Sequence, residues 1–112
     1  MSKIYVGVDP GAGGALAVYD KTQNKLLFAE NLAYVTEVVN RKERKRLDWD
    51  ALDRQFVTAA VLGATECIIE DVSGVVGQSA SASFTFGFTT CMCHASARRA
   101  GLNVHKIRPP IS

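Results

Sequence analysis

The chain contains few cysteines and prolines, with three of each among its 112 residues, and it has no long hydrophobic run. An odd cysteine count, and no start that is basic and then apolar, are typical of proteins that stay in a reducing compartment. The apolar runs, such as residues 59–64, are far shorter than the roughly 18 to 20 residues of a membrane-spanning helix. We therefore expect a cytoplasmic protein that is neither secreted nor inserted into a membrane.

Length and composition predict one folded domain over residues 1–112. Hydrophobic residues make up 47% of the chain and charged residues 21%, which are ordinary values for a globular domain. A domain of this size buries roughly two-thirds of the surface that its unfolded chain exposes. That burial is sufficient for a core without disulfides or structural metals.

Charge is distributed unevenly along the chain, although the net charge is only +2. The first 71 residues contain nine Lys or Arg and eleven Asp or Glu, whereas the rest contain four basic residues and no acidic one. A basic run before the first expected helix is predicted to project into solvent, where it could contact phosphates. Its cations are Arg41, Lys42, Arg44, Lys45 and Arg46. The other interpretation is a solvated loop that has no ligand.

The order of hydrophobic segments predicts an α/β fold with a five-stranded mixed sheet. Residues 3–8, 14–19 and 26–30 are expected to form three antiparallel strands, followed by a linker over residues 32–46. Asp48 is expected to cap a helix that ends near Gly63 and packs on the sheet through an apolar stripe. The stripe consists of Trp49, Leu52, Phe56, Ala59 and Ala60. Residues 66–72 and 103–107 are expected to be strands parallel to the first.

A second helix is predicted over residues 84–99, after a loop of small residues at 74–83. The residues that share its expected inward face are Phe84, Phe88, Cys91, Met92 and Ala95. This assignment leaves Phe86 exposed, where its ring could stack on nucleobases. Cys91 and Cys93 point in different directions on a helix, so we interpret them as small core residues and not as ligands of one metal. His94 and His105 are interpreted as packing or surface residues.

Two carboxylates are placed at the ends of strands that we expect to be parallel neighbours. Asp9 ends the first strand, and Glu70 lies near the end of the fourth. Because ligands bind at the carboxyl ends of strands in open α/β sheets, these side chains could converge there on a cation. Oxygen ligands suit Mg²⁺, and Mn²⁺ is expected to substitute for it. The other interpretation is two unrelated polar residues, because Asp before Pro-Gly is ordinary in turns.

The ordered set of motifs resembles the RuvC-like Holliday junction resolvases of the ribonuclease H-like superfamily, including phage and bacterial relatives. It consists of IYVGVDPG at residues 4–11, IIE at 68–70, FTFG at 84–87 and GLNV at 101–104. The resemblance implies a homodimeric, Mg²⁺-dependent endonuclease that cleaves branched DNA in recombination and repair. It implies catalytic, metal-binding roles for Asp9 and Glu70, and it makes the basic run and Phe86 candidate DNA contacts.

The same resemblance implies further acidic ligands on a helix after the fifth strand, and residues 108–112 contain no acidic residue. We therefore expect a C-terminally truncated domain whose cleavage is weak or absent. Two alternatives stay open. One is a non-catalytic DNA-binding or dimerisation remnant of such a nuclease. The other is a lobe of an actin-like or sugar-kinase-like ATPase, which would use the glycine-rich turn after Asp9 to bind phosphate.

Overall fold

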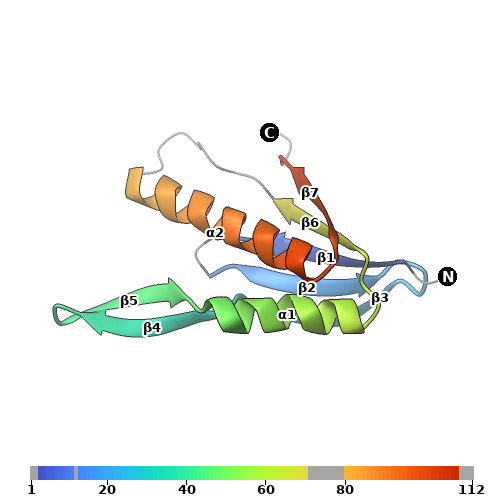
Figure 1. Cartoon of the computed structure of the whole chain (residues 1–112), viewed down its shortest axis with the longest axis horizontal. Coiled ribbons are helices and arrows are strands. Elements are labelled where there is room, and N and C mark those ends of the chain that lie inside the picture. Colours follow the sequence, from blue (N-terminus) through green and yellow to red (C-terminus); the bar gives the residue numbers. More distant parts are fainter. Residues whose placement is uncertain (1–2, 12, 71–79, 109–112) are drawn as a thin grey trace.

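A five-stranded mixed sheet forms the centre of the protein (Figure 1). The computed structural model describes residues 3–11, 13–70 and 80–108. β1 (Ile4–Asp9), β2 (Ala15–Asp20) and β3 (Lys25–Asn31) form an antiparallel meander. β6 (Glu66–Glu70) and β7 (Asn103–Ile107) run parallel to β1, which gives the strand order β3-β2-β1-β6-β7. The predicted α/β sheet, with antiparallel strands followed by parallel strands, is confirmed.

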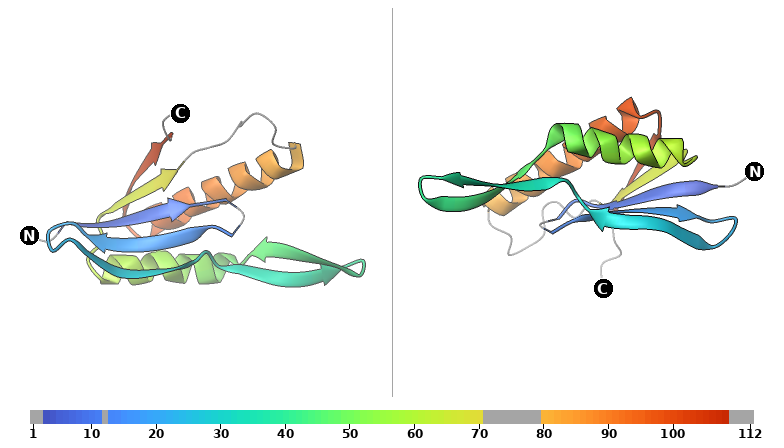
Figure 2. Two further views of the ribbon diagram at one scale, coloured as in Figure 1. Left: turned by 180° about the vertical axis from the view of Figure 1, so that it is seen from behind. Right: turned by 90° about the horizontal axis from the view of Figure 1, so that it is seen from below.

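Two helices, α1 (Trp49–Val61) and α2 (Ala80–Arg99), cover one face of the sheet (Figure 2). Alternate residues of β1 point to this face, and Val6 and Val8 are buried there. They belong to a core cluster with Phe56 of α1 and Ala97 of α2. The opposite face is covered by no helix of the described residues. No helix within those residues has the length and apolar character needed to span a membrane.

The first helix begins as predicted. Asp48 adopts an extended conformation, and its Oδ1 accepts a hydrogen bond of 3.2 Å from the backbone N–H of Ala51. This contact satisfies one of the N–H groups that the first turn leaves without a partner. Leu52 and Phe56 are fully buried as expected, but Trp49 is exposed. The predicted apolar stripe is therefore correct except at its first residue, where the helix has not yet reached the sheet.

The predicted linker over residues 32–46 is wrong, because most of it forms a β-hairpin. β4 (Tyr34–Val39) and β5 (Lys42–Leu47) pair only with each other, in a separate two-stranded sheet. The turn places Asn40 at φ 51° and Arg41 at φ 64°. Two residues with positive φ are the geometry of a type I′ turn, which sequence usually signals by Asn-Gly. The hairpin projects from the body and lies along the longest dimension of the molecule, 50 Å (Figure 1).

The second helix begins earlier than predicted, and its buried face differs from the predicted one, although Met92 packs against the core as expected. Residues 80–83 are helical and not part of a loop, while 74–79 lie outside the described residues. Phe84, Phe88 and Cys91 are exposed, whereas Phe86 and Cys93 are buried. The expectations of an inward Phe84 and Phe88 and a core Cys91 are therefore wrong, and the core position of Cys93 is confirmed. Burial raises the pKa of the Cys93 thiol to about 12.

Hydroxyl groups explain why the inward face of α2 was misassigned. Thr89, Thr90 and Ser96 are buried, and each side chain has a hydrogen-bond partner. Thr90 donates to the carbonyl of Phe86 at 2.9 Å, and the Thr89 and Tyr34 hydroxyls lie 2.9 Å apart. Paired hydroxyls can be buried at little cost. Hydroxyl groups therefore occupy part of the inner face of this helix, beside the buried Phe86, while the rings of Phe84 and Phe88 are left outside.

Replacing Gly87 with alanine is expected to stabilise the protein by about 0.5 to 1 kcal/mol, because glycine is unfavourable inside a helix. An added Cβ at Gly87 would meet no atom within 4 Å. Urea denaturation of the wild type and G87A measures the difference. A loss of stability would show that the helix is distorted at this position.

An ion pair joins the two helices on the surface. Asp53 of α1 accepts hydrogen bonds from the Ser96 hydroxyl and from Arg99 Nη2, the latter at 2.7 Å. The Ser96 hydrogen bond and then the Arg99 hydrogen bond hold the pKa of Asp53 below its ordinary value. Because the folded pKa is depressed, this contribution to stability is present at neutral pH and is lost as pH falls through the lowered pKa, below about 4.

Asp53→Asn is therefore expected to lower the free energy of unfolding at pH 7 by about 0.5 to 1 kcal/mol, as is usual for a partly exposed pair. The difference from the wild type should shrink as the pH falls toward the lowered pKa of Asp53, because the wild type then loses the contribution of this carboxylate. Urea unfolding at pH 7 and pH 3 measures both effects. An equal deficit at the two pH values would mean that the charge of Asp53 contributes nothing.

Candidate functional site

The carboxyl ends of the three parallel strands meet at one edge of the sheet. Val8 of β1 lies opposite Ile69 of β6, and both are buried beneath the helices. The residues that follow them, Asp9 and Glu70, therefore point to the open face, because successive side chains of a strand alternate. Both carboxylates line one hollow of that face. The structure thus brings together the two acidic residues that the sequence singled out.

A tight turn holds Asp9 in place. Asp9 Oδ1 accepts a hydrogen bond of 3.1 Å from the backbone N–H of Gly11. The N–H of Gly14 donates to the Gly11 carbonyl at 2.7 Å, and Gly13 adopts a φ of +72°, which favours glycine. Glycine is therefore required in this turn by the backbone, by the positive φ at Gly13 and by the lack of space for a side chain at Gly14.

Phe86 supports this turn from the helix side. Its side chain is 7% exposed, and a Cβ added to Gly11 would lie 3.8 Å from its ring. The prediction that Phe86 is exposed and able to stack on DNA bases is therefore wrong. The physical reason is that the helix face carrying Phe86 is the one that packs on the sheet.

The donor set of the hollow fits a hard divalent cation in part. Asp9 and Glu70 supply carboxylate oxygens, which Mg²⁺ and Mn²⁺ prefer. Within the described ranges, no group of three or more His, Cys, Asp or Glu side chains could hold a metal ion. Two carboxylates suit Mg²⁺ when water and substrate phosphates complete its shell. Asp71, considered as a substitute ligand, lies outside the described residues.

Arg108 is a site residue that sequence reasoning missed. It directly follows β7, is exposed, and lines the same hollow as Asp9 and Glu70. Its position follows from the topology, because β7 runs parallel to β6 and ends at the same edge. A predicted strand at 103–107 that runs parallel to its neighbours was enough to indicate this position, because it places the residue after β7 beside the ends of β1 and β6. A guanidinium here can contact a phosphate held near the carboxylates.

The five basic residues all lie on the hairpin, but they are divided between its turn and its two faces. Residues paired across a β-ladder share a face. The register pairs Arg46 with Val35, Arg44 with Glu37, and Lys42 with Val39, which places three cations on one face. Arg46 also forms an exposed ion pair with Glu37 at 3.1 Å.

Lys45 faces the other way. It lies opposite Thr36, and both line a hollow whose far wall is Gly13 and Gly14 of the turn after β1. Lys45 is therefore the hairpin cation that shares a surface with the turn holding Asp9. Arg41 occupies the hairpin turn itself.

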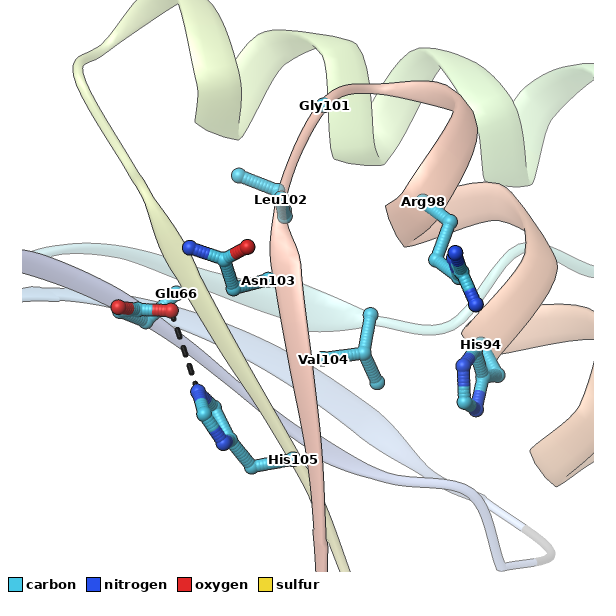
Figure 3. A pocket seen from close by; sticks show the side chains of 8 residues that line it. All are labelled: Glu66, His94, Arg98, Gly101, Leu102, Asn103, Val104 and His105. Atoms are coloured by element: carbon cyan, nitrogen blue, oxygen red, sulfur yellow. Dashed lines mark hydrogen bonds and ion pairs between the residues drawn. The ribbon is translucent and has the colours of Figure 1, made fainter.

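Another hollow lies near the amino ends of β6 and β7 (Figure 3). Glu66 and His105 form an exposed ion pair at 3.2 Å on one side of β7. His94 and Arg98 of α2 lie on the other side of the strand, so the polar groups do not converge. Burial, then Lys106 and Arg98, lower the pKa of His94. The position of both histidines agrees with their interpretation as packing and surface residues.

Comparison with known proteins places this geometry in a known fold. No protein-family model and no curated protein matches the sequence. Among solved structures, the chain is similar to T. thermophilus RuvC in complex with a Holliday junction substrate, with a TM-score of 0.60 and 15% identity over 96% of this chain. It is also similar to another Thermus thermophilus RuvC structure, with a TM-score of 0.55 and 15% identity over 95% of this chain.

The chain spans 65% and 64% of the length of these two RuvC chains. At this level of identity the likeness shows a shared fold, a mixed five-stranded sheet with helices. The fold implied by the motif resemblance is thereby supported.

Proposed function

We propose that the chain is a RuvC-like domain over residues 1–112 that binds branched DNA and supports metal-dependent cleavage of a phosphodiester. The observation that carries this proposal is the placement of Asp9 and Glu70 in one open hollow at the carboxyl ends of adjacent parallel strands. The similarity in fold to RuvC bound to a Holliday junction substrate adds support.

Each part of the site has a distinct role in this proposal. Asp9 and Glu70 would hold Mg²⁺ or Mn²⁺, which, when bound, stabilises negative charge on a phosphate and activates water. The turn around Gly11 fixes the Asp9 carboxylate through its hydrogen bond of 3.1 Å. Arg108 contacts the phosphate beside the carboxylates, and Lys45 contacts a phosphate nearer the hairpin. In a homodimer, two-fold symmetry would pair two such sites with the two strands to be cut.

The alternative is a DNA-binding domain without cleavage activity. It is favoured by one observation, which is that the described residues supply two carboxylates and no larger group of metal ligands. A domain with an incomplete set of metal ligands would still have its basic hairpin and its sheet. Binding would then persist while cleavage is weak or absent.

Cleavage of an end-labelled four-way junction, beside a linear duplex of the same sequence, tests the proposal. The wild type, Asp9→Asn and Glu70→Gln are compared in Mg²⁺ and in Mn²⁺, with Asp50→Asn on α1 as the control. Junction-selective nicking that is lost in the first two variants and kept in the control supports a nuclease. Selective binding without nicking supports the alternative, and a wild type that neither binds nor nicks the junction overturns both.

The salt dependence of binding tests the role of the hairpin. Replacing Lys42 and Arg44 with serine is expected to flatten the slope of log K against log salt concentration by about 2, because each phosphate contact contributes about 0.9. The matched control replaces Lys21 and Lys25, which lie around the β2–β3 turn at the other end of the molecule (Figure 1). Fluorescence anisotropy with a labelled junction measures the slopes. Equal slopes for the two double variants would remove the hairpin face that carries Lys42 and Arg44 from the DNA contact.

A further inference from the structure

Three exposed aromatic rings form a row across the starts of the two helices. The Phe84 and Phe88 rings are stacked, with centroids 6.5 Å apart and planes inclined by 17°. The Trp49 ring lies 6.4 Å from Phe88. The exposed fractions are 74% for Phe84, 43% for Phe88 and 53% for Trp49. We call these three residues the aromatic row.

The row is not part of the hydrophobic core. The core cluster contains Phe56 and Leu52 of α1 and Cys93 of α2, which lie on other faces of the same helices. Three of the nine aromatic residues of the chain are therefore displayed together to solvent. Contiguous exposed aromatic surface of this kind marks a binding site, because large rings gain much from being covered.

The hairpin brings positive charge next to the aromatic row. Trp49 follows the end of β5 by only two residues, and Arg46, which is ion-paired with Glu37, lies three residues before it. At the base of the hairpin, the Tyr34 hydroxyl lies 2.9 Å from that of Thr89, the residue after Phe88. The hairpin and the first half of α2 also extend toward the same end of the molecule (Figures 1 and 2).

Charges on the helices indicate how a ligand would lie. The stretch of α2 from Phe84 to Ala97 contains no carboxylate, whereas α1 carries Asp50 beside Trp49. The phosphates of a polyanion would therefore lie along the basic hairpin, and its apolar groups would contact the aromatic row. Flat rings that adjoin a basic hairpin match the two chemical features of unpaired nucleotides, which are a π-face and a phosphate.

We propose that Trp49, Phe84 and Phe88 form a platform on which unpaired nucleobases stack. The inference rests on the proposed DNA-binding function and extends it, because it assigns the unpaired bases of a branched or single-stranded DNA to a separate surface. The row is distinct from the carboxylate hollow, since the helices cover the opposite face of the sheet. It gives the domain a means to prefer DNA with open base pairs over a continuous duplex.

Trp49 is the single tryptophan of the chain, so its fluorescence reports directly on stacking. Single-stranded oligo(dT) and a four-way junction are expected to quench it, and a blunt linear duplex is not. Replacing Phe84 and Phe88 together with serine is expected to weaken binding to oligo(dT) about tenfold or more, since each stacked base contributes roughly 1 to 3 kcal/mol. The salt slope and the affinity for duplex should be unchanged.

The control replaces Val61, the last residue of α1, and Leu62, which follows it, with serine; both are exposed apolar residues at the other end of the helix. Equal oligo(dT) affinity for the Phe variant and this control, with duplex binding intact, overturns the platform and leaves the proposed DNA binding standing. No binding to any DNA overturns both. If the Phe variant instead changes the sedimentation of the protein without DNA, the row is a contact between copies and the platform is rejected.

Discussion

Gly14→Ala is expected to destabilise the protein by about 3 kcal/mol or more, as forced overpacking against fixed atoms does. A Cβ at this position would lie 2.1 Å from the carbonyl oxygen of Asp9 and 2.7 Å from that of Gly11. It would also lie 3.1 Å from Cδ1 of Leu32. Two of the three obstacles are backbone atoms, so no side-chain rotation relieves the clash. The turn that carries Asp9 must move or the strand pair must separate.

Urea denaturation measures this loss, and Gly7→Ala is its control. Gly7 lies on the same strand as Asp9, but an added Cβ there meets no atom within 4 Å. Alanine is better tolerated than glycine in a strand, so this variant should be neutral or slightly stabilised. Similar losses in the two variants would show that the tight turn is not what requires glycine at position 14.

Phe86→Ala is expected to cost about 3 to 5 kcal/mol of folding stability, which is the usual effect of removing a buried phenylalanine ring. Phe84→Ala, two residues earlier, should change stability little, because its ring is largely exposed. Removing the Phe86 ring would also leave a void beneath Gly11 and loosen the support of the Asp9 turn. Thermal and urea unfolding of the two variants provide the comparison.

Phe86→Leu separates packing from ring chemistry. Leucine fills much of the same space, so it should recover a large part of the stability that alanine loses. DNA affinity is measured under conditions where each variant is folded. Substitution of Phe84 should weaken DNA binding directly, because it removes a stacking ring. Substitution of Phe86 should weaken binding only to the extent that it destabilises the fold. The interpretation of Phe86 as a packing residue fails if Phe86→Ala remains stable and only loses DNA binding.

The strands and the first helix could be predicted from the sequence because local patterns there agree with the tertiary structure. Apolar residues alternate along β1, and Asp48 has the side chain that a helix start requires. The parallel pairing of β1 with β6 followed from the intervening helix. From that pairing alone, Asp9 and Glu70 were expected to converge, and they line one hollow.

The errors arose where local patterns and tertiary structure disagree. β5 reads KERKRL, which has no apolar alternation because both of its faces are exposed except at Leu47. The inner face of α2 contains paired hydroxyls beside Phe86, and the outer face exposes the rings of Phe84 and Phe88, which departs from the usual apolar stripe. Arg108 was missed because its role depends on where β7 ends in space and not on any motif.

The attachment of the hairpin divides the molecule into two units of unequal local stability. β4 and β5 bond to each other and to no strand of the central sheet. Among the described residues, the contacts of the hairpin with the body include the buried Leu47 and the contact between the Tyr34 and Thr89 hydroxyls. Isolated two-stranded ribbons are only marginally stable in water. The hairpin amides should therefore exchange with deuterium by local opening, long before those of β1, so the most basic segment of the chain can adapt its shape while the sheet stays folded.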